Sequence, residues 1–234
     1  MPTINPGRDV ELRVDNQSTW ALARDRSSAQ SARTTATGGT VRASAASGVY
    51  DCYRYMAAFD TSSITGTVAS ATLSIYGYLY TNADVIIVKV SSGATGSPTS
   101  DFVVSDYSKI TGFVAGSTMS GNVTDYSSQF TGWTSGVYNV ITLNSNALSD
   151  ISSLSDFKLA MVTYDYDYIN SAPPSGGTYR SGFRTVNVST VSQRPVLEYT
   201  LSTGYSNSVL GVSAASISTV SGIASANIDK VNGV

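Results

Sequence analysis

The 234-residue sequence contains no histidine and only one cysteine, Cys52. Without histidine, Ser-His-Asp and Cys-His nucleophilic sites are excluded, together with the commonest general base and most zinc sites. A single cysteine cannot form an intramolecular disulfide, and its place in the strand-like run 50–60 indicates a small buried hydrophobic residue. No Gly-rich phosphate loop of Walker or Rossmann spacing is present. We therefore expect a protein that is not an enzyme and that has no cofactor.

Charge and long apolar runs are also scarce. Charged residues make up 13% of the chain, whereas a share of about 25% is usual. The formal net charge is −2. Such a weak field does not favour nucleic acid or an anionic membrane as a partner. No stretch approaches the ~18 apolar residues of a membrane span. The opening residues MPTINPGRDVEL lack the basic start and apolar core of a secretory signal, so we expect synthesis in the cytoplasm of the producing cell.

Arginines gather in the first quarter of the chain, and among them are the five residues Arg24, Arg26, Arg33, Arg42 and Arg54. Asp25 and Asp51 lie among them and dilute their charge. This mixture is typical of a solvated sheet edge, where we expect these arginines to lie.

Serine, threonine, glycine and tyrosine are abundant instead. Short β-branched or aromatic runs alternate with Gly, Ser, Asn and Asp clusters, and no βαβ rhythm appears. The predicted strands are 9–14, 18–25, 40–45, 50–60, 70–80, 84–90, 138–144, 157–167, 179–186 and 194–201. The pattern predicts an all-β fold, an antiparallel sandwich or barrel of one domain followed by a C-terminal tail.

One helix is predicted, over residues 144–154. Leu148, Ile151 and Leu154 form an apolar stripe, and Ser145 or Asn146 is the expected N-cap. We expect this helix to close one end of the sandwich. Residues 91–99 and 171–178 are expected to be exposed loops.

Residues 54–78, RYMAAFDTSSITGTVASATLSIYGY, carry an Arg, an apolar strand, an FD-x-S-S-I turn and an S-A-T-L-x-I-Y strand. SDYSKI (105–110), ITLNSNAL (141–148) and RPVLEYTL (194–201) follow in order. In these motifs the chain resembles the DNRLRE-type domain, a jelly-roll β-sandwich module of bacterial surface proteins and phage structural proteins. The resemblance implies a jelly-roll sandwich for residues 1–203.

The first motif also has a physical interpretation. Asp60 ends a strand, and the hydroxyl residues after it can form an Asx-type turn that Ile64 would pin to the core. Arg54 could extend toward a carboxylate such as Asp60. We expect these roles to be structural.

The segment TYDYDYIN (163–170) is the most suggestive of chemistry. In a strand, Asp165 and Asp167 would share one face roughly 7 Å apart, while Tyr164, Tyr166 and Tyr168 would take the other. Phenol rings stack on sugars, and paired acids bind hydroxyls or Ca²⁺. The alternatives are a polar solvent face of a strand that runs into a loop, a carbohydrate or calcium contact, and, least favoured, a pair of catalytic carboxylates.

Trp133 follows a Gly/Ser-rich segment that also contains Tyr107 and Tyr126. If these rings are exposed together, they form a recognition patch. If they are separate, they are anchors of the sandwich core.

The last 31 residues, 204–234, repeat every eleven residues, with glycines at 211, 222 and 233. On a helix the apolar residues of the repeat would share one face; these are Val212, Ile217, Val220, Ile223, Ile228, Val231 and Val234. The glycines limit each repeat to one or two helical turns, which are not stable alone. We expect the tail to dock on sister chains or on another protein, and a frayed terminus is the alternative.

The tail is similar to the I-x-x-V-N-G-V repeats at the ends of phage structural proteins. The two resemblances imply a virion component, such as a head decoration, fibre or neck or tail appendage, that is homo-oligomeric or bound to other virion proteins. The alternative is a carbohydrate-binding module of a bacterial surface or secreted protein, with host or environmental glycans as partners.

Overall fold

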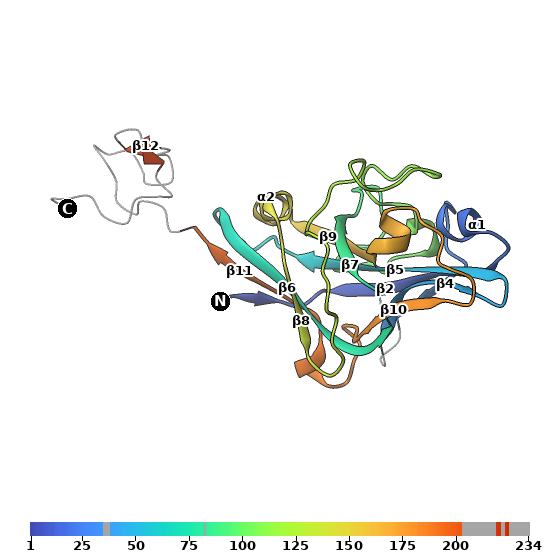
Figure 1. Ribbon diagram of the computed structural model, residues 1–234. Coiled ribbons are helices and arrows are strands. Elements are labelled where there is room, and N and C mark those ends of the chain that lie inside the picture. The colour runs from blue at the N-terminus through green and yellow to red at the C-terminus, as the bar shows by residue number, and fades with distance from the viewer. Residues whose placement is uncertain (35–37, 82, 203–218, 221–222, 225–234) are drawn as a thin grey trace.

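The computed structural model describes residues 1–34, 38–81, 83–202, 219–220 and 223–224. Within these ranges the chain forms antiparallel strands with a few short helices, as Figure 1 shows. The strands of residues 3–201 join into one continuous sheet that folds over into two layers. The predicted all-β antiparallel sandwich is confirmed.

The first layer is centred on the N-terminal part of β6 (Val68–Thr81). β11 (Val196–Leu201) pairs with one edge of β6, and β8 (Tyr138–Thr142) pairs with the other. β1 (Thr3–Ile4) pairs with the far side of β11, so the N-terminus lies beside the last strand of the sandwich. Ser, Thr and Tyr on the outer face alternate with apolar residues on the inner face, as expected for a half-buried strand.

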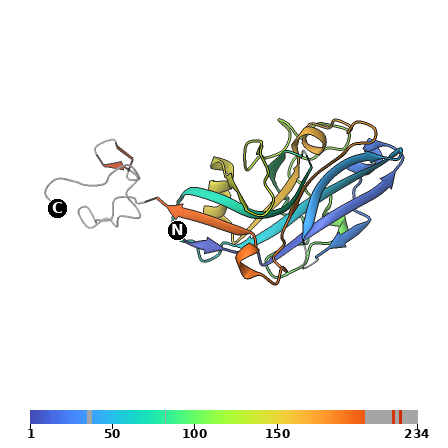
Figure 2. The ribbon, with the colours of Figure 1, turned by 60° about the horizontal axis from the view of Figure 1, so that its bottom comes forward.

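The second layer is centred on β5 (Val49–Asp60), which pairs along one side with β2 (Arg8–Gln17). On its other side β5 pairs first with β4 (Gly39–Ala46) and then with β9 (Asp156–Thr163). Three further strands complete the layer, namely β3 (Ser31–Arg33), β7 (Val85–Lys89) and β10 (Thr178–Phe183). β10 pairs with both β4 and the C-terminal part of β6, so the long strand β6 links the two layers (Figure 2).

The second layer is buried on both faces. Tyr55 and Phe59 of β5 point into the core between the layers, together with Leu73 of β6. Cys52 and Met56, on the opposite face of β5, belong to a separate apolar cluster. That cluster is covered by the helix α1 (Trp20–Arg24) and by residues that follow β7, including Phe102, Tyr107 and Met119. Cys52 is fully buried, as predicted.

The predicted strand 18–25 is wrong, because residues Trp20–Arg24 form the helix α1. The hydroxyl of Thr19 accepts a hydrogen bond from the backbone N–H of Leu22 at 3.2 Å, which is a helix N-cap. Trp20 and Ala23 are buried at helical spacing, whereas Leu22 is 50% exposed. Trp20 and Leu22 therefore do not share a face, as they would in a strand.

The predicted helix is confirmed as α2 (Ser145–Ser153), but its cap is Asn144. The Asn144 side-chain oxygen accepts from the backbone N–H groups of Asn146 at 3.0 Å and Ala147 at 3.2 Å. Ala147 and Ile151 are buried against the core between the layers. Of the predicted stripe, Ile151 is buried and Leu148 packs partly against the core, whereas Leu154 is 40% exposed and is wrong.

The predicted turn after β5 is also found. Asp60 accepts hydrogen bonds from the backbone N–H of Ser62 at 3.0 Å and from its hydroxyl at 2.6 Å. Ile64 is buried in the core between the layers. This turn is an Asx-type turn pinned by an apolar side chain, as the sequence indicated.

The helical prediction for the tail is wrong at the four positions that the structure describes. Thr219–Val220 and Ile223–Ala224 form two short antiparallel strands, β12 and β13, in which Val220 pairs with Ile223. β-Branched residues favour strand over helix, which accounts for the difference. The remaining predicted tail residues lie outside the described residues: Val212, Ile217, Ile228, Val231 and Val234.

Candidate functional site

The tyrosine-rich segment that sequence reasoning singled out is not a strand. Residues Tyr164–Tyr168 form one π-helical turn directly after β9, and Thr163 caps it by accepting from the N–H of Asp167 at 3.2 Å. The ring of Tyr164 stacks on that of Tyr168, with centroids 5.1 Å apart. The predicted arrangement, with acids on one face and tyrosines on the other, is therefore not found.

Asp167 is fully buried and is paired with two arginines. Arg54 of β5 approaches it with two nitrogens, Nε at 2.7 Å from Oδ2 and Nη2 at 2.8 Å from Oδ1. Arg24 of α1 places its Nε 3.2 Å from Oδ1 and donates to the backbone oxygen of Asp167 at 2.7 Å. Because guanidinium groups hold both carboxylate oxygens, Asp167 does not form the predicted pair with Asp165 for sugar hydroxyls or Ca²⁺.

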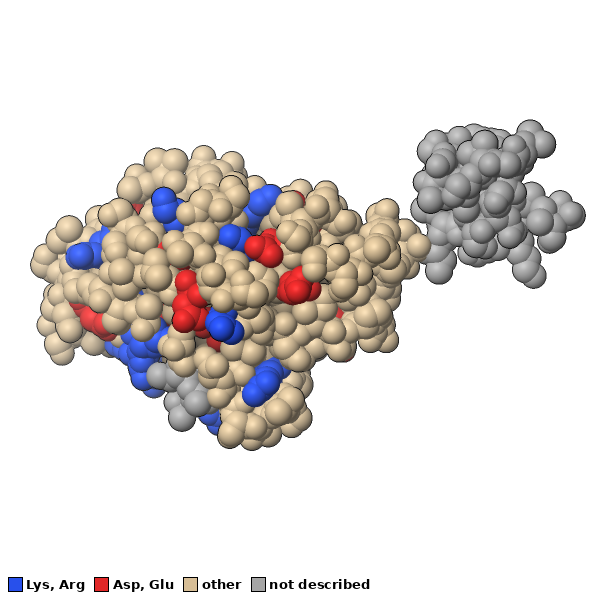
Figure 3. Space-filling view, turned by 180° about the vertical axis from the view of Figure 1, so that it is seen from behind, with Lys and Arg blue, Asp and Glu red and all other residues tan. Residues whose placement is uncertain are grey.

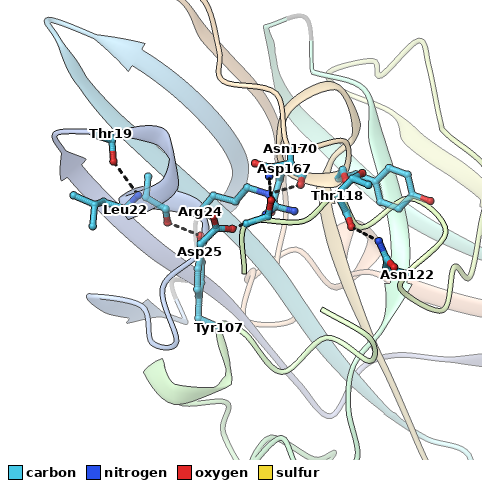
Figure 4. A network of polar contacts seen from close by, with 12 residues as sticks. Thr19, Leu22, Arg24, Asp25, Tyr107, Thr118, Asn122, Asp167 and Asn170 are labelled. Atoms are coloured by element: carbon cyan, nitrogen blue, oxygen red, sulfur yellow. Dashed lines mark hydrogen bonds and ion pairs between the residues drawn. The ribbon is translucent and has the colours of Figure 1, made fainter. Parts of the chain in front are cut away.

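The remaining contacts make these arginines part of a clamp between four segments of the chain. Arg54 also donates to the backbone oxygens of Tyr107 at 2.8 Å and Arg24 at 3.0 Å, and it lies over the Phe113 ring at 4.6 Å. Arg24 pairs with Asp25 at 2.5 Å, as Figure 4 shows. The clamp ties α1, β5, the loop around 107 and the turn 164–168 together.

The expected exposed edge is therefore wrong for two of the five arginines, because Arg24 and Arg54 are fully buried. The expected partner of Arg54 is wrong as well, since Asp60 accepts from Ser62 instead. Burial opposes the charged form of Arg54 and is the largest single effect, but the charge of Asp167, the hydrogen bonds to its carboxylate and the nearby Tyr107 and Cys52 together outweigh it, so the pKa of Arg54 is raised. Burial first, and then the charge of Asp167, raise the pKa of Cys52, which agrees with a buried hydrophobic role for this thiol.

Three of the six residues predicted to bind carbohydrate remain partly accessible: Tyr164, Asp165 and Tyr166. Tyr166 packs against Tyr179 of β10 with centroids 4.5 Å apart. Partial burial, followed by the charge of Asp84, raises the pKa of Asp165. Tyr168 is buried and donates to Asp125 at 2.8 Å.

Trp133 is only 3% exposed, and Tyr107 and Tyr126 are buried too. The indole N–H of Trp133 donates to the backbone oxygen of Gly182 at 3.2 Å, and its ring meets Phe130 edge to face. The Tyr107 hydroxyl donates to the oxygen of Ala23 at 3.1 Å. These rings are separate anchors of the core, which is the second of the two alternatives that the sequence left open.

A row of tyrosines at the surface was missed by sequence reasoning. Tyr76, Tyr78 and Tyr80 alternate along the outer face of β6, and Tyr78 and Tyr80 are 39% and 38% exposed. Tyr138 of β8 extends the row, because it pairs with Tyr76 and meets its ring edge to face at 5.4 Å. The alternation of tyrosine in IYGYLY (75–80), opposite the inward Leu73 and Ile75, was the signal that could have predicted it.

Hydrogen bonds to backbone oxygens fix the hydroxyl groups of Tyr76 and Tyr138. Tyr76 donates to the backbone oxygen of Gly136 at 2.6 Å, and Tyr138 donates to those of Ser192 and Arg194, both at 2.9 Å. The guanidinium of Arg184 lies over the Tyr78 ring at 5.0 Å. Surface charge is sparse, and in Figure 3 acidic and basic groups are scattered across a mostly uncharged face.

Comparison with known proteins gave no relative: no family model matches the chain, and no curated protein matches it. Among the described residues, no helix is both long and apolar enough to cross a bilayer. The same part of the chain contains no group of three or more acidic, cysteine or histidine side chains placed to hold a metal ion.

Proposed function

We propose that the chain is a non-enzymatic structural component of a bacteriophage virion that displays its jelly-roll sandwich and docks through residues 204–234. The observation that carries this proposal is the position of β11. This strand lies beside β1 in the first layer and leads directly into the repeat segment. Docking through the segment that follows β11 would leave the rest of the sandwich free to face outward.

The internal construction of the sandwich agrees with a role in display. Two apolar clusters fill it, and the Arg24–Arg54–Asp167 clamp joins the covering helix and loops to the central strand. Such a domain holds its shape without help from a partner. The repeat segment has few apolar residues per repeat in its sequence, and short repeats of this kind need neighbours to bury them, so docking on sister chains or on another virion protein is its proposed role.

Mass spectrometry of purified particles, from the phage whose genome encodes this sequence, tests the proposal. The expected result is a stoichiometric peptide signal that persists after density-gradient purification. Absence of the protein from purified particles would overturn the virion assignment.

A second candidate function is carbohydrate binding, and the exposed tyrosine row on β6 favours it. The three rings stand at every second residue of one strand, a spacing of about 7 Å in a regular strand, and such a spacing lets neighbouring sugar units stack on successive rings. In this case the chain is a carbohydrate-binding module with host or environmental glycans as partners. A virion appendage that adheres to glycans would combine both functions.

A further inference from the structure

A cavity of about 470 Å³ opens at one end of the second layer. It lies where β7 ends at Lys89 and β9 begins at Asp156, close to the C-terminal end of α2. Its volume falls within the ~300–1,000 Å³ of small-molecule sites. Of the residues that the sequence singled out for recognition, Tyr126 alone lines this cavity.

Backbone hydrogen bonds fix the walls of the cavity. The N–H of Thr111 donates to the oxygen of Lys89 at 2.9 Å, and the N–H of Val90 donates to that of Lys158 at 3.3 Å. The N–H of Thr61 donates to the oxygen of Ser155 at 2.9 Å. Because these bonds join segments far apart in the sequence, the cavity is formed before any ligand arrives, which favours binding.

The two lysines of the lining differ in their partners. Lys89 forms an ion pair with Asp150 at 2.7 Å, and the Tyr126 hydroxyl donates to the same carboxylate oxygen at 2.5 Å. Lys158 donates to the backbone oxygen of Ala94 at 3.2 Å, and no described carboxylate forms an ion pair with it. Lys158 therefore brings to the cavity a positive charge that has no ion-pair partner among the described residues and that has spare donors.

Side chains with hydroxyl groups line the same cavity as Lys158. Within the described part of the chain, the side chains of Ser92, Thr111 and Ser155 make no hydrogen bond, so they are free to bind a ligand. Asp156 adds an exposed carboxylate that accepts hydrogen bonds. We propose that this cavity binds a sugar acid, whose carboxylate pairs with Lys158 while its ring hydroxyls bond to the serine, threonine and Asp156 side chains.

The carboxylate is the feature that selects the ligand. A charge-assisted hydrogen bond between an ammonium and a carboxylate is shorter and stronger than one to a neutral hydroxyl. A neutral sugar would displace water from the Lys158 ammonium without neutralising the charge of this group. The proposal is independent of whether the chain belongs to a virion, because it depends only on the cavity.

Titration of the full chain with glucuronate and with glucose, followed by saturation-transfer NMR and calorimetry, tests the proposal. Glucuronate should bind about tenfold more tightly than glucose, the ratio expected for one charge-assisted hydrogen bond. Lys158→Met should abolish this preference. Lys109→Met is the matched control, because Lys109 is exposed and lies outside the lining, and it should leave the preference intact.

Equal binding of the two sugars by the wild-type chain, or a preference that survives in Lys158→Met, would overturn the proposal. Thermal melts of each variant accompany the titrations. If Lys158→Met does not fold, Thr111→Asp replaces it, because a carboxylate added to the lining repels the ligand. Undiminished glucuronate binding by Thr111→Asp would also overturn the proposal.

Discussion

Arg54 and Asp167, 113 residues apart in the sequence, form a two-pronged ion pair that is fully buried between the central strand and a π-helical turn. The donors of Arg54 that point away from Asp167 are used by the backbone oxygens of Tyr107 and Arg24. The pair therefore sets the position of the layer that covers the outer face of β5.

Replacing Arg54 with methionine should destabilise the fold strongly, because it leaves the carboxylate of Asp167 buried with Arg24 as its sole guanidinium partner. A loss of about 3–5 kcal/mol in the free energy of unfolding is expected, measured by urea denaturation. Arg8→Ala is the control, since the Arg8–Asp101 pair is largely exposed and should contribute less than about 1 kcal/mol.

Arg54→Lys should also be destabilised, because an ammonium cannot reproduce the two-pronged contact or the stacking on Phe113. Wild-type stability in both Arg54 variants would contradict the clamp. Equal losses in the free energy of unfolding for Arg8→Ala and Arg54→Met would also contradict the clamp.

Stability should depend on pH through Asp9. Burial raises the pKa of Asp9 from 3.8 to about 7, and hydrogen bonds from the Val186 N–H and the Tyr55 hydroxyl offset this only in part. The folded chain therefore binds more protons than the unfolded chain between pH 3.8 and about 7. The free energy of unfolding should fall as the pH rises through this window, by up to about 4 kcal/mol.

Asp9→Asn removes the titrating group. Its stability relative to the wild-type chain should rise between pH 4 and pH 8, as measured by thermal melts across that range. Parallel stability curves for the two proteins would show that Asp9 does not titrate as described.

Asn144→Ala should weaken the start of α2. It removes the side-chain acceptor for two backbone N–H groups and a hydrogen bond to the oxygen of Asp125 at 2.9 Å. A loss of about 1–2 kcal/mol in the free energy of unfolding is expected. Asn146→Ala is the comparison, since Asn146 is exposed and makes one longer contact to Asp125 at 3.3 Å. A larger loss for Asn146→Ala would assign the cap to Asn146, one of the two residues that the sequence indicated.

The tyrosine row predicts how carbohydrate binding would respond to mutation. On a glycan array, the double variant Tyr78→Ala, Tyr80→Ala should lose binding while its melting temperature stays close to that of the wild-type chain, because both rings are exposed. Tyr166→Ala, which lies outside the row, should retain binding. If Tyr166→Ala lost binding and the double variant retained it, the binding site would lie in the segment 164–168 instead.

Trp133→Ala separates a core role from a binding role. Because Trp133 is buried, its removal should cost about 3–5 kcal/mol of stability, measured by urea denaturation. A variant with wild-type stability but no glycan binding would contradict the placement of Trp133 in the core.

Most of the fold could be predicted from the alternation of apolar and polar residues along the strands. Because side chains of a strand alternate with a period of two residues, the sequence predicted the inward orientation of Leu73 and Ile75 in β6 and the strand β7 from its apolar run. The Asx turn at Asp60 was equally readable, since its hydrogen bonds are local. Features that depend on neighbours in the sequence could therefore be predicted.

The clamp could not be predicted, because the burial of Arg54 depends on an acid 113 residues away. The same distant pair explains the error at 164–168. Alternating tyrosines and aspartates favour a strand locally, but the ion pair of Asp167 holds this segment in a turn. Helix α1 spans five residues, too few for a periodic pattern to separate helix from strand. The tyrosine row, by contrast, could have been predicted from strand alternation, because Tyr76, Tyr78 and Tyr80 alternate with the inward-facing positions of β6.

The incorporation of a truncated chain into particles tests the central claim most directly. Phage that encode residues 1–203 alone are purified beside wild-type phage, and the copy number of the protein per particle is measured by quantitative mass spectrometry. The account predicts that the truncated sandwich folds with an unchanged melting temperature but is missing from the particles. Incorporation at the wild-type copy number would show that the sandwich itself makes the docking contact and would contradict the account.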